Sequence, residues 1–331
     1  MYIIKKAILD SEKQKVKAFL ETKGLKYEND ITETYYIDGV IATVSLANNI
    51  IKCLAVDDTY ANENLASQLI DYVIKEMQAR GIYHLLVYTK AEYEAVFNSM
   101  NFKTIVKTDK VSFMEFGDPD INDAIVKIKN QVQNQFQADL SLLDIGAVVA
   151  NCNPITDGHL SLIEMASKLH DVVILFLVEE DNSMFTFQER LTLAYLATKP
   201  LCNVIVVPST NYIVSKLTFP GYFLKSPEEK EMQYSKVDAM IFKKHFMPML
   251  NINKRYIGTE TKDYMCAYNR VLKEVLQEKV VEVERYKKDE TTISASLVRK
   301  LIEEGKISEA VEYVPIATKA IFQMIARSKR W

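Results

Sequence analysis

The spacing of apolar and polar residues divides the chain into a first part rich in strands and a second part in which strands and helices alternate. Up to about Asp118, this spacing predicts consecutive strands with hairpin turns at Asp38-Gly39 and Asn48-Asn49. A single long helix is predicted over Ala61–Arg80, and Gly81 ends it. Strands are predicted at Thr34–Ile37, Val40–Leu46, Asn49–Val56, Tyr83–Thr89, Lys103–Thr108 and Lys110–Phe116, and a short helix at Glu92–Met100.

A polar stretch rich in Asn and Gln joins the two parts, from Asp118-Pro119 to about Leu140. Its apolar residues recur at helical spacing, which predicts a linker helix that buries one apolar stripe. These residues are Ile121, Ile125, Ile128 and Val132. We therefore expect a first domain over residues 1–118, a linker helix over 119–141 and a second domain over 142–331.

The second part alternates short apolar strands with helices, the order typical of an α/β protein with a parallel, doubly wound, Rossmann-like sheet. Strands are predicted at Leu142–Ala150, Val172–Val178, Asn203–Val207, Arg255–Gly258 and Val280–Glu284. Helices are predicted at Gly158–Leu169, Thr186–Thr198, Pro227–Phe246, Thr261–Gln277, Ser294–Glu304 and Pro315–Arg327. Ligands of such sheets bind beyond the carboxyl ends of the strands, where the strand order reverses. The turn after the first strand is therefore the expected position of a ligand site.

Composition and charge narrow the class of protein. With 48% hydrophobic and 26% charged residues in 331, the chain has the composition of a soluble globular protein with room for two cores. The net charge is −3 and Lys and Arg are scattered, which argues against nucleic acid as a partner. No apolar run is long enough to span a membrane, and the N-terminus lacks the apolar core of a signal peptide. We therefore expect a cytoplasmic protein.

The four cysteines lie far apart in the sequence and form no Cys-x-x-Cys pair; they are Cys53, Cys152, Cys202 and Cys266. This spacing is typical of reduced thiols rather than of disulfides or a zinc site. Cys152 lies in the turn after the first strand of the second part, where it is either a small filler or a reactive thiol.

The stretch Asn151-Cys-Asn-Pro-Ile-Thr-Asp-Gly-His159 is that turn, between an apolar strand and a helix. Thr156 or Asp157 can cap the helix. The free N–H groups and the dipole of a helix N-terminus favour an anion, and His159 lies in the first turn, within reach of a bound phosphate. The alternative is a polar turn with a purely structural role.

A second helix start, Thr291-Thr-Ile-Ser-Ala-Ser-Leu-Val-Arg299, carries hydroxyl groups and a guanidinium. Ser294 is a good N-cap, and Ser296 and Arg299 share one face of the helix. The planar fork of donors of an Arg suits a polyphosphate. The alternative is a capped surface helix with a solvated Arg. Gly258-Thr259-Glu260 ends a strand at the same edge of the sheet and either lines a nucleotide pocket or is a strand-ending turn.

The order of elements in the first part resembles the GNAT acetyltransferase superfamily. In that family a glycine-rich turn before the long helix cradles the pyrophosphate of acetyl-CoA. The matching stretch here is Tyr60-Ala-Asn-Glu-Asn-Leu-Ala66, with Asn62 and Asn64 in place of glycine. Asn tolerates positive φ, but its side chain crowds a close approach to phosphate. The resemblance therefore implies the fold and leaves the acetyl-CoA site open.

Thr156-x-Gly158-His159 and Ile293-Ser-x-Ser-x-x-Arg299 resemble the paired signatures of the nucleotidyltransferase superfamily, whose members attack the α-phosphate of a nucleoside triphosphate and release pyrophosphate. A closer resemblance, which covers essentially the whole chain, is to the citrate lyase ligase family. It is carried by the stretch 151–159, Phe187-Gln-Glu-Arg190, Asn211-Tyr-Ile-Val-Ser215, Thr218-Phe-Pro-Gly-Tyr-Phe-Leu-Lys225 and Tyr256-Ile-Gly-Thr-Glu260. An acetyltransferase-like first domain is also part of that family's arrangement.

This resemblance implies that ATP and acetate give acetyl-adenylate and pyrophosphate. The thiol of the CoA-like prosthetic group on the acyl-carrier subunit of citrate lyase then takes the acetyl group and releases AMP. Under this hypothesis His159 and Thr156 act on the α-phosphate, and Ser294, Ser296 and Arg299 hold the β- and γ-phosphates. Mg²⁺ bridges phosphate oxygens and keeps most of its waters, so no dedicated cluster of metal ligands is expected.

The resemblance also assigns roles to other residues. Asn153 is expected to hold the turn and to contact phosphate, and Gly258, Thr259 and Glu260 to bind ATP on its adenosine side. Arg190 and Lys225 are phosphate candidates by their positions in the matched motifs, with a solvated helix Arg and a loop Lys as the alternatives.

Two questions stay open in the sequence. A rival function is an adenylyltransferase that acts on a phosphorylated acceptor such as pantetheine phosphate, since it shares both signatures. The first domain is either an acyltransferase or a docking module that grips the pantetheine arm of the carrier. The sequence does not indicate which residues bind acetate, how the carrier thiol reaches the adenylate, or the oligomeric state.

Overall fold

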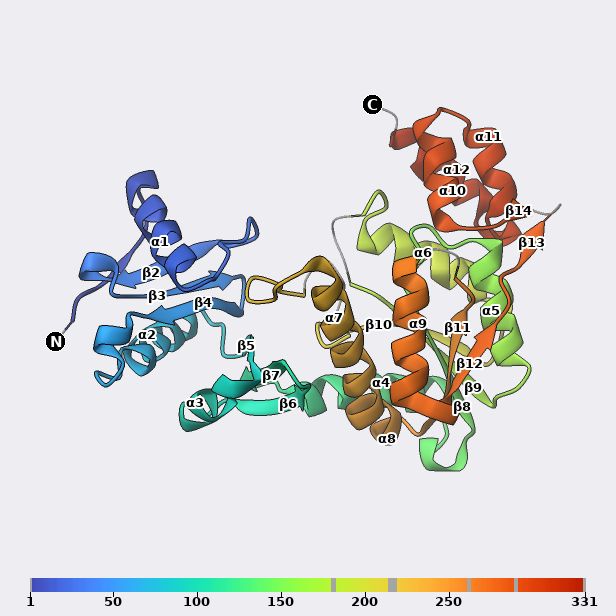
Figure 1. Ribbon diagram of the computed structural model, residues 1–331. Coiled ribbons are helices and arrows are strands. Elements are labelled where there is room, and N and C mark those ends of the chain that lie inside the picture. Colours follow the sequence, from blue (N-terminus) through green and yellow to red (C-terminus); the bar gives the residue numbers. More distant parts are fainter. Residues whose placement is uncertain (1, 180–182, 214–218, 261–262, 289–290, 330–331) are drawn as a thin grey trace. The chain divides into compact units, whose positions relative to one another are not determined.

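The computed structural model describes residues 2–179, 183–213, 219–260, 263–288 and 291–329 (Figure 1). The described residues of 1–123 and 216–237 form one compact unit, and those of 124–215 and 238–331 form the other. The first unit thus includes residues 219–237, which the sequence places in the second domain. The domain limits at residues 118 and 142 stay a prediction.

The first unit is built on a seven-stranded sheet in the order β1-β2-β3-β4-β5-β7-β6. Neighbouring strands are antiparallel, except that β4 and β5 are parallel. The strands are β1 Ile4–Lys6, β2 Glu33–Ile37, β3 Ala42–Ala47, β4 Ile50–Val56, β5 Leu85–Lys90, β6 Lys103–Lys107 and β7 Val111–Phe116, and the helices are α1 Asp10–Thr22, α2 Leu65–Ala79 and α3 Glu94–Ser99. This mixed sheet, with α2 between β4 and β5, confirms the expected GNAT-like α+β fold.

The expectation of a single long helix in this part is wrong, because α1 is a second one. Its sequence is mostly polar and only Val16 and Leu20 are buried, so its apolar spacing is too sparse to predict a helix. The carboxylate of Glu12 accepts hydrogen bonds from the backbone N–H groups of Ile8 and Leu9, which satisfies donors at the helix start.

The helix α2 begins four residues later than the apolar pattern indicates. Asn64 precedes it in the left-handed conformation, with φ 53°, which a continuous helix does not allow. Asn64 thus adopts the positive φ that Asn tolerates better than most residues.

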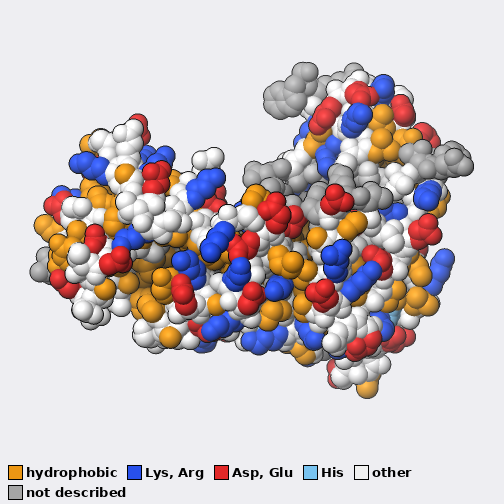
Figure 2. All heavy atoms as spheres, viewed as in Figure 1, with side chains coloured by type: hydrophobic (Ala, Val, Ile, Leu, Met, Phe, Trp, Pro, Cys, Tyr) orange, Lys and Arg blue, Asp and Glu red, His pale blue; other side chains and the backbone are white. Residues whose placement is uncertain are grey.

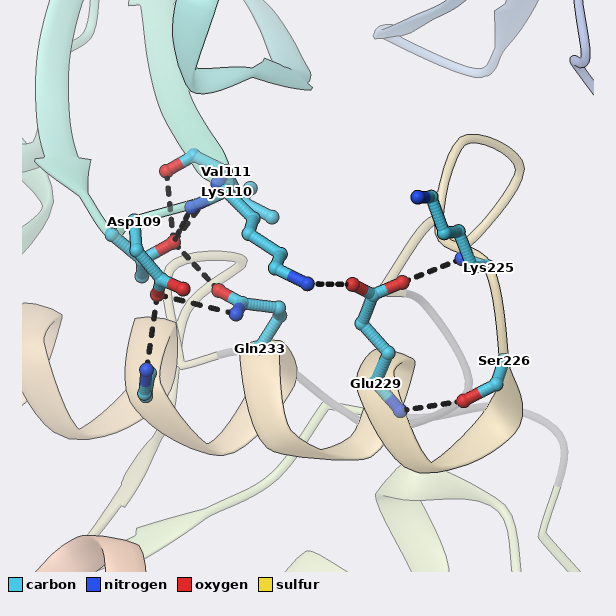
Figure 3. A network of polar contacts seen from close by, with 9 residues as sticks. Asp109, Lys110, Val111, Lys225, Ser226, Glu229 and Gln233 are labelled. Atoms are coloured by element: carbon cyan, nitrogen blue, oxygen red, sulfur yellow. Dashed lines mark hydrogen bonds and ion pairs between the residues drawn. The ribbon is translucent and has the colours of Figure 1, made fainter.

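Residues 219–237 are fixed to the rest of the first unit by polar contacts around the start of α7 (Pro227–Ile241). Figure 3 shows Glu229 paired with Lys110, while its other carboxylate oxygen accepts from the backbone N–H of Lys225 over 2.6 Å. Thr108 donates its hydroxyl to Gln233 over 2.6 Å, and Lys236 pairs with Asp109 over 3.0 Å. These contacts tie α7 to the turn between β6 and β7.

Tyr222, in the same segment, lies where β4 and β5 separate. These strands pair only through Ile50 with Leu86 and Ile51 with Val87. Beyond that point the phenol of Tyr222 donates to the backbone carbonyl of Tyr88 in β5 over 3.1 Å, and its ring clusters with Cys53 of β4. Burial raises the pKa of Tyr222, and its side chain connects the two strands where their own pairing has stopped.

The second unit is built on a five-stranded parallel sheet in the order β10-β9-β8-β11-β12. The strands are β8 Ile145–Ala150, β9 Val172–Leu177, β10 Val204–Pro208, β11 Ile252–Gly258 and β12 Val280–Val283. Successive crossovers run outward from β8 in one direction and from β11 in the other, which confirms the doubly wound sheet. The carboxyl ends of β8 and β11 therefore flank the point where the strand order reverses.

Helices connect these strands, and a short hairpin precedes the last helices (Figure 1). The helices are α4 Ile121–Phe136, α5 Asp157–Ser167, α6 Phe187–Thr198, α8 Met247–Met249, α9 Asp263–Leu276, α10 Ala295–Glu303, α11 Ile307–Ala310 and α12 Lys319–Ser328, and the hairpin strands are β13 Lys287–Lys288 and β14 Thr291–Thr292. Ile121, Ile125, Ile128 and Val132 of α4 are all buried, which confirms the predicted helix and its stripe. Across the described ranges, no helix combines the length and apolar content needed to cross a membrane.

Candidate functional site

The turn after β8 presents His159 at the start of α5. Thr156 is the N-cap residue, its backbone N–H donates to Nδ1 of His159 over 3.1 Å, and its hydroxyl lies 2.9 Å from the same nitrogen. The ring therefore occupies the place that Glu or Gln takes in the usual capping box. Because Nδ1 accepts a backbone N–H, the proton of the neutral imidazole is on Nε2, which becomes a hydrogen-bond donor on the opposite side of the ring.

His159 is held in its neutral form by its surroundings. Burial is the largest cause and, together with the positive charges of Arg285 and Arg299, lowers its pKa from 6.5 to about 4. At neutral pH the residue is thus an uncharged N–H donor next to two guanidinium groups.

The second helix start lies against the first. A Cβ on Gly158 would lie 3.3 Å from the backbone carbonyl oxygen of Ile293, so the absence of a side chain there permits this approach. Ser294 caps α10 by accepting from the N–H of Leu297 over 3.2 Å. The N-termini of α5 and α10 therefore meet in the second unit, and a helix N-terminus favours an anion.

Arg299 connects the two helix starts through its guanidinium. Nη1 donates to the carbonyl of Asn153 over 2.5 Å, and Nη2 donates to the hydroxyl of Ser296 over 3.3 Å. The side-chain oxygen of Asn153 accepts from the N–H of Phe185 over 3.2 Å, which fixes the turn from its other side. The structure thus brings together Asn153, Thr156, His159, Ser294, Ser296 and Arg299.

The carboxyl end of β11 carries the next group of predicted residues. The N–H of Thr259 donates to Val283 over 2.8 Å, and the hydroxyl of Thr259 accepts from the N–H of Arg285 over 3.1 Å. Glu260 forms an ion pair with the guanidinium of Arg285. The carbonyl of Gly258 accepts from the side-chain amide of Asn269 over 2.9 Å. Arg285, which the sequence did not single out, therefore joins this strand end to the charges around His159.

Arg190 lies in the core with no exposed surface. Its Nη1 donates to the backbone carbonyls of Asn151 and Val178 over 2.8 Å each, and Nε donates to Phe185 over 3.3 Å. These carbonyls belong to the segments after β8 and β9, so Arg190 positions the turn that carries Thr156 and His159. The alternative of a solvated helix Arg is wrong, and its role as a phosphate ligand stays a prediction.

Lys225 belongs to the first unit, and its phosphate role stays a prediction. Burial raises the pKa of Cys152 to about 12, which suits a filler side chain rather than a reactive thiol. Within the described residues, no three His, Cys, Asp or Glu side chains gather as metal ligands. Figure 2 shows Lys and Arg interspersed with Asp and Glu on the face in view.

This arrangement is suited to a nucleoside polyphosphate. Two helix N-termini, a neutral imidazole N–H and two guanidinium groups lie at the carboxyl edge of a parallel sheet, next to its reversal point. Donors fixed in this way stabilise negative charge that develops on phosphate oxygens.

Comparison with known proteins finds similarity over most of the chain. The sequence model of the family described as "Citrate lyase ligase C-terminal domain" matches residues 145–322, more than half of the chain. The chain is 32% identical over 300 residues to "[Citrate [pro-3S]-lyase] ligase" of Escherichia coli K12, covering 88% of this chain and 84% of the relative. It is 31% identical over 335 residues to the protein of that name from Haemophilus influenzae, covering 94% and 95%.

A shorter similarity involves another class of enzyme. Over 64 residues the chain is 41% identical to "Phosphopantetheine adenylyltransferase" of Campylobacter curvus, which covers 19% of this chain and 41% of that protein.

Proposed function

Because the chain belongs to the citrate lyase ligase family, we propose that it uses ATP to acetylate the thiol of the prosthetic group on the acyl-carrier subunit of citrate lyase. In the first step an acetate oxygen bonds to the α-phosphorus of ATP, and pyrophosphate leaves. In the second step the carrier thiol loses its proton and attacks the carbonyl carbon of acetyl-adenylate, and AMP leaves. The products are a thioester, AMP and pyrophosphate.

The observation that supports the first step is the contact between the two helix starts. Arg299 of α10 donates to the carbonyl of Asn153, in the turn that also carries Thr156 and His159. One triphosphate at this edge of the sheet can therefore meet His159 at its α-phosphate, and Ser294, Ser296 and Arg299 at its β- and γ-phosphates. Gly258, Thr259 and Glu260, at the end of the adjacent strand, bind the adenosine side.

His159 acts in this proposal as a neutral donor. Attack at the α-phosphorus increases the negative charge on the non-bridging oxygens, and the Nε2–H stabilises that charge. Thr156 fixes the ring orientation through Nδ1. Since the pKa of His159 is lowered to about 4, this donor stays in one protonation state at all pH values near neutrality.

Other components follow from the reaction. Mg²⁺ would enter with ATP and neutralise charge on its phosphates, and we expect no dedicated carboxylate cluster to hold it. The partners are acetate and the acyl-carrier subunit, with no role for nucleic acid or membrane. We place the reaction in the cytoplasm, where ATP and reduced thiols are available.

The decisive experiment is isotope exchange between labelled pyrophosphate and ATP. Exchange that requires acetate supports acetyl-adenylate formation by this protein. Exchange that requires pantetheine phosphate instead of acetate supports the rival adenylyltransferase, whose support here is the 64-residue similarity. The second step is tested with labelled acetate, ATP and the deacetylated carrier subunit. Label that stays off the carrier thiol while exchange proceeds contradicts the acetylation step.

A further inference from the structure

Arg285 lies at the carboxyl edge of the second sheet, two residues after β12. Its backbone N–H donates to the hydroxyl of Thr259 over 3.1 Å, and its guanidinium pairs with the carboxylate of Glu260. Thr259 and Glu260 directly follow β11, which is the strand next to β12. The side chain of Arg285 keeps 28% of its surface exposed and that of Glu260 keeps 12%. The guanidinium is therefore anchored to the end of β11 and is still accessible to a ligand.

The main chain after Arg285 leads to the other half of the site. The carbonyl of Tyr286 accepts from the N–H of Ile293 over 3.4 Å, and the carbonyl of Ile293 lies against Gly158 at the start of α5. Arg285 and Arg299 are the charged groups that lower the pKa of His159, alongside burial. Of the two arginines that act on His159, Arg285 is held at the end of β11 and Arg299 belongs to α10.

We propose that Arg285 binds the α-phosphate of the nucleotide from its adenosine side, opposite the pyrophosphate-binding Arg299. This inference rests on the proposed function, because it assumes that a nucleotide lies between the end of β11 and the start of α10. Glu260 holds the guanidinium at the sheet edge before the nucleotide arrives, which limits the rotamer entropy that binding must remove. A planar guanidinium can keep one N–H on Glu260 while another donates to phosphate.

If Arg285 binds the α-phosphate and Arg299 binds pyrophosphate, substitutions of these two arginines should weaken the binding of different ligands. Arg285→Gln should weaken AMP and ATP binding at least tenfold and leave pyrophosphate binding unchanged. Arg299→Gln should weaken ATP and pyrophosphate binding and affect AMP less. Arg285→Lys should lie between Arg285→Gln and wild type, because it keeps the charge and loses the fork. Arg270→Gln, an exposed arginine on α9, is the matched control and should bind all three ligands as wild type does.

Titration calorimetry of the full chain measures these affinities without catalysis. An NMR titration of His159 adds a readout in the ligand-free protein, where Arg285→Gln should raise the pKa of the imidazole from about 4 toward its ordinary value. Thermal unfolding establishes that each variant is folded. If Arg285→Gln does not fold, the affinities of Arg285→Lys are used to test the proposal.

The outcomes separate the two proposals. Wild-type affinity for AMP in Arg285→Gln, or an equal loss of AMP and pyrophosphate binding, overturns the Arg285 assignment even where acetate-dependent exchange is normal. A wild-type protein that binds AMP through Arg285 but shows no acetate-dependent exchange overturns the proposed function and leaves the assignment of Arg285 in place.

Discussion

The backbone N–H of Thr156 donates to Nδ1 of His159 over 3.1 Å, so one contact both caps α5 and determines which ring nitrogen carries the proton. The capping function can be met by any acceptor of the right length at this position, and Gln is a usual one. The Nε2–H, in contrast, is specific to the imidazole. These two functions of His159 can therefore be separated by substitution.

His159→Gln should keep the cap and lose catalysis. We expect acetate-dependent pyrophosphate exchange to fall by roughly 10²–10³-fold, the usual effect of removing one transition-state donor. Binding of ATP, measured by calorimetry, should stay within a few-fold of wild type, because the helix N-termini and Arg299 are unchanged. Wild-type turnover in a folded His159→Gln protein would refute the catalytic role, and His159→Ala, which also removes the cap, shows the added cost in stability.

Arg299→Lys tests whether the fork of the guanidinium is needed. Arg299 donates to Asn153 and Ser296 through different nitrogens, and a single ammonium cannot span both and a phosphate. We expect kcat/KM for ATP to fall by about 10–100-fold, the equivalent of one charged hydrogen bond. The neighbouring exposed Lys300 provides the control, since Lys300→Gln should change kcat/KM for ATP little. Equal losses in the two variants would contradict a specific role of Arg299.

Arg190→Met should lower the free energy of unfolding more than it weakens ATP binding. The substitution leaves the partly buried carbonyls of Asn151 and Val178 without this donor, and an unsatisfied buried group costs about 1–3 kcal/mol. We expect urea denaturation to show a free energy of unfolding lower by roughly 2–4 kcal/mol. Arg327→Met, at an exposed position of α12, should change it by less than about 0.5 kcal/mol. A fully stable Arg190→Met protein with weakened ATP binding would instead make Arg190 a phosphate ligand.

Much of the fold and part of the site could be predicted because they depend on residues that are close together in the sequence. The apolar stripe of α4 and the strands of the parallel sheet follow from periodicity within a few residues of sequence. The cap at Thr156 follows from the residue type in a turn before a helix. These features need no knowledge of which distant segments meet.

Features that depend on distant contacts could not be predicted. Residues 219–237 join the first unit through pairs such as Lys110 with Glu229, which are 119 residues apart in the sequence. In the sequence, Arg285 is one of several charged residues that follow β12. Only the pairing of β12 with β11 brings it next to Glu260. Its one signal in the sequence is its position just beyond the carboxyl end of a strand in a doubly wound sheet.

The cysteines should differ in reactivity because they differ in burial. The thiol of Cys152 is buried and its pKa is raised to about 12, so almost none of it is thiolate at pH 8, whereas Cys202 is exposed. Brief treatment of the folded protein with iodoacetamide should modify Cys202 and leave Cys152 intact, as peptide mass spectrometry can determine. Cys152→Ala should retain pyrophosphate exchange. Rapid alkylation of Cys152 in the folded chain would contradict its role as a filler.

The lowered pKa of His159 should also appear in the pH dependence of stability. The pKa of His159 is about 4 in the folded protein and 6.5 in the unfolded chain. Between these two pH values the unfolded chain therefore binds more protons at this residue than the folded protein does. The free energy of unfolding therefore falls as the pH falls through this window, by on the order of 1–2 kcal/mol from this group after screening by solvent. His159→Gln lacks the titrating group and keeps the cap, so it should lose less stability than wild type between pH 7 and pH 4.5. Urea denaturation of both proteins at the two pH values measures the difference. Equal losses in the two proteins would show that the imidazole titrates normally, and the neutral donor proposed for catalysis would then have no basis.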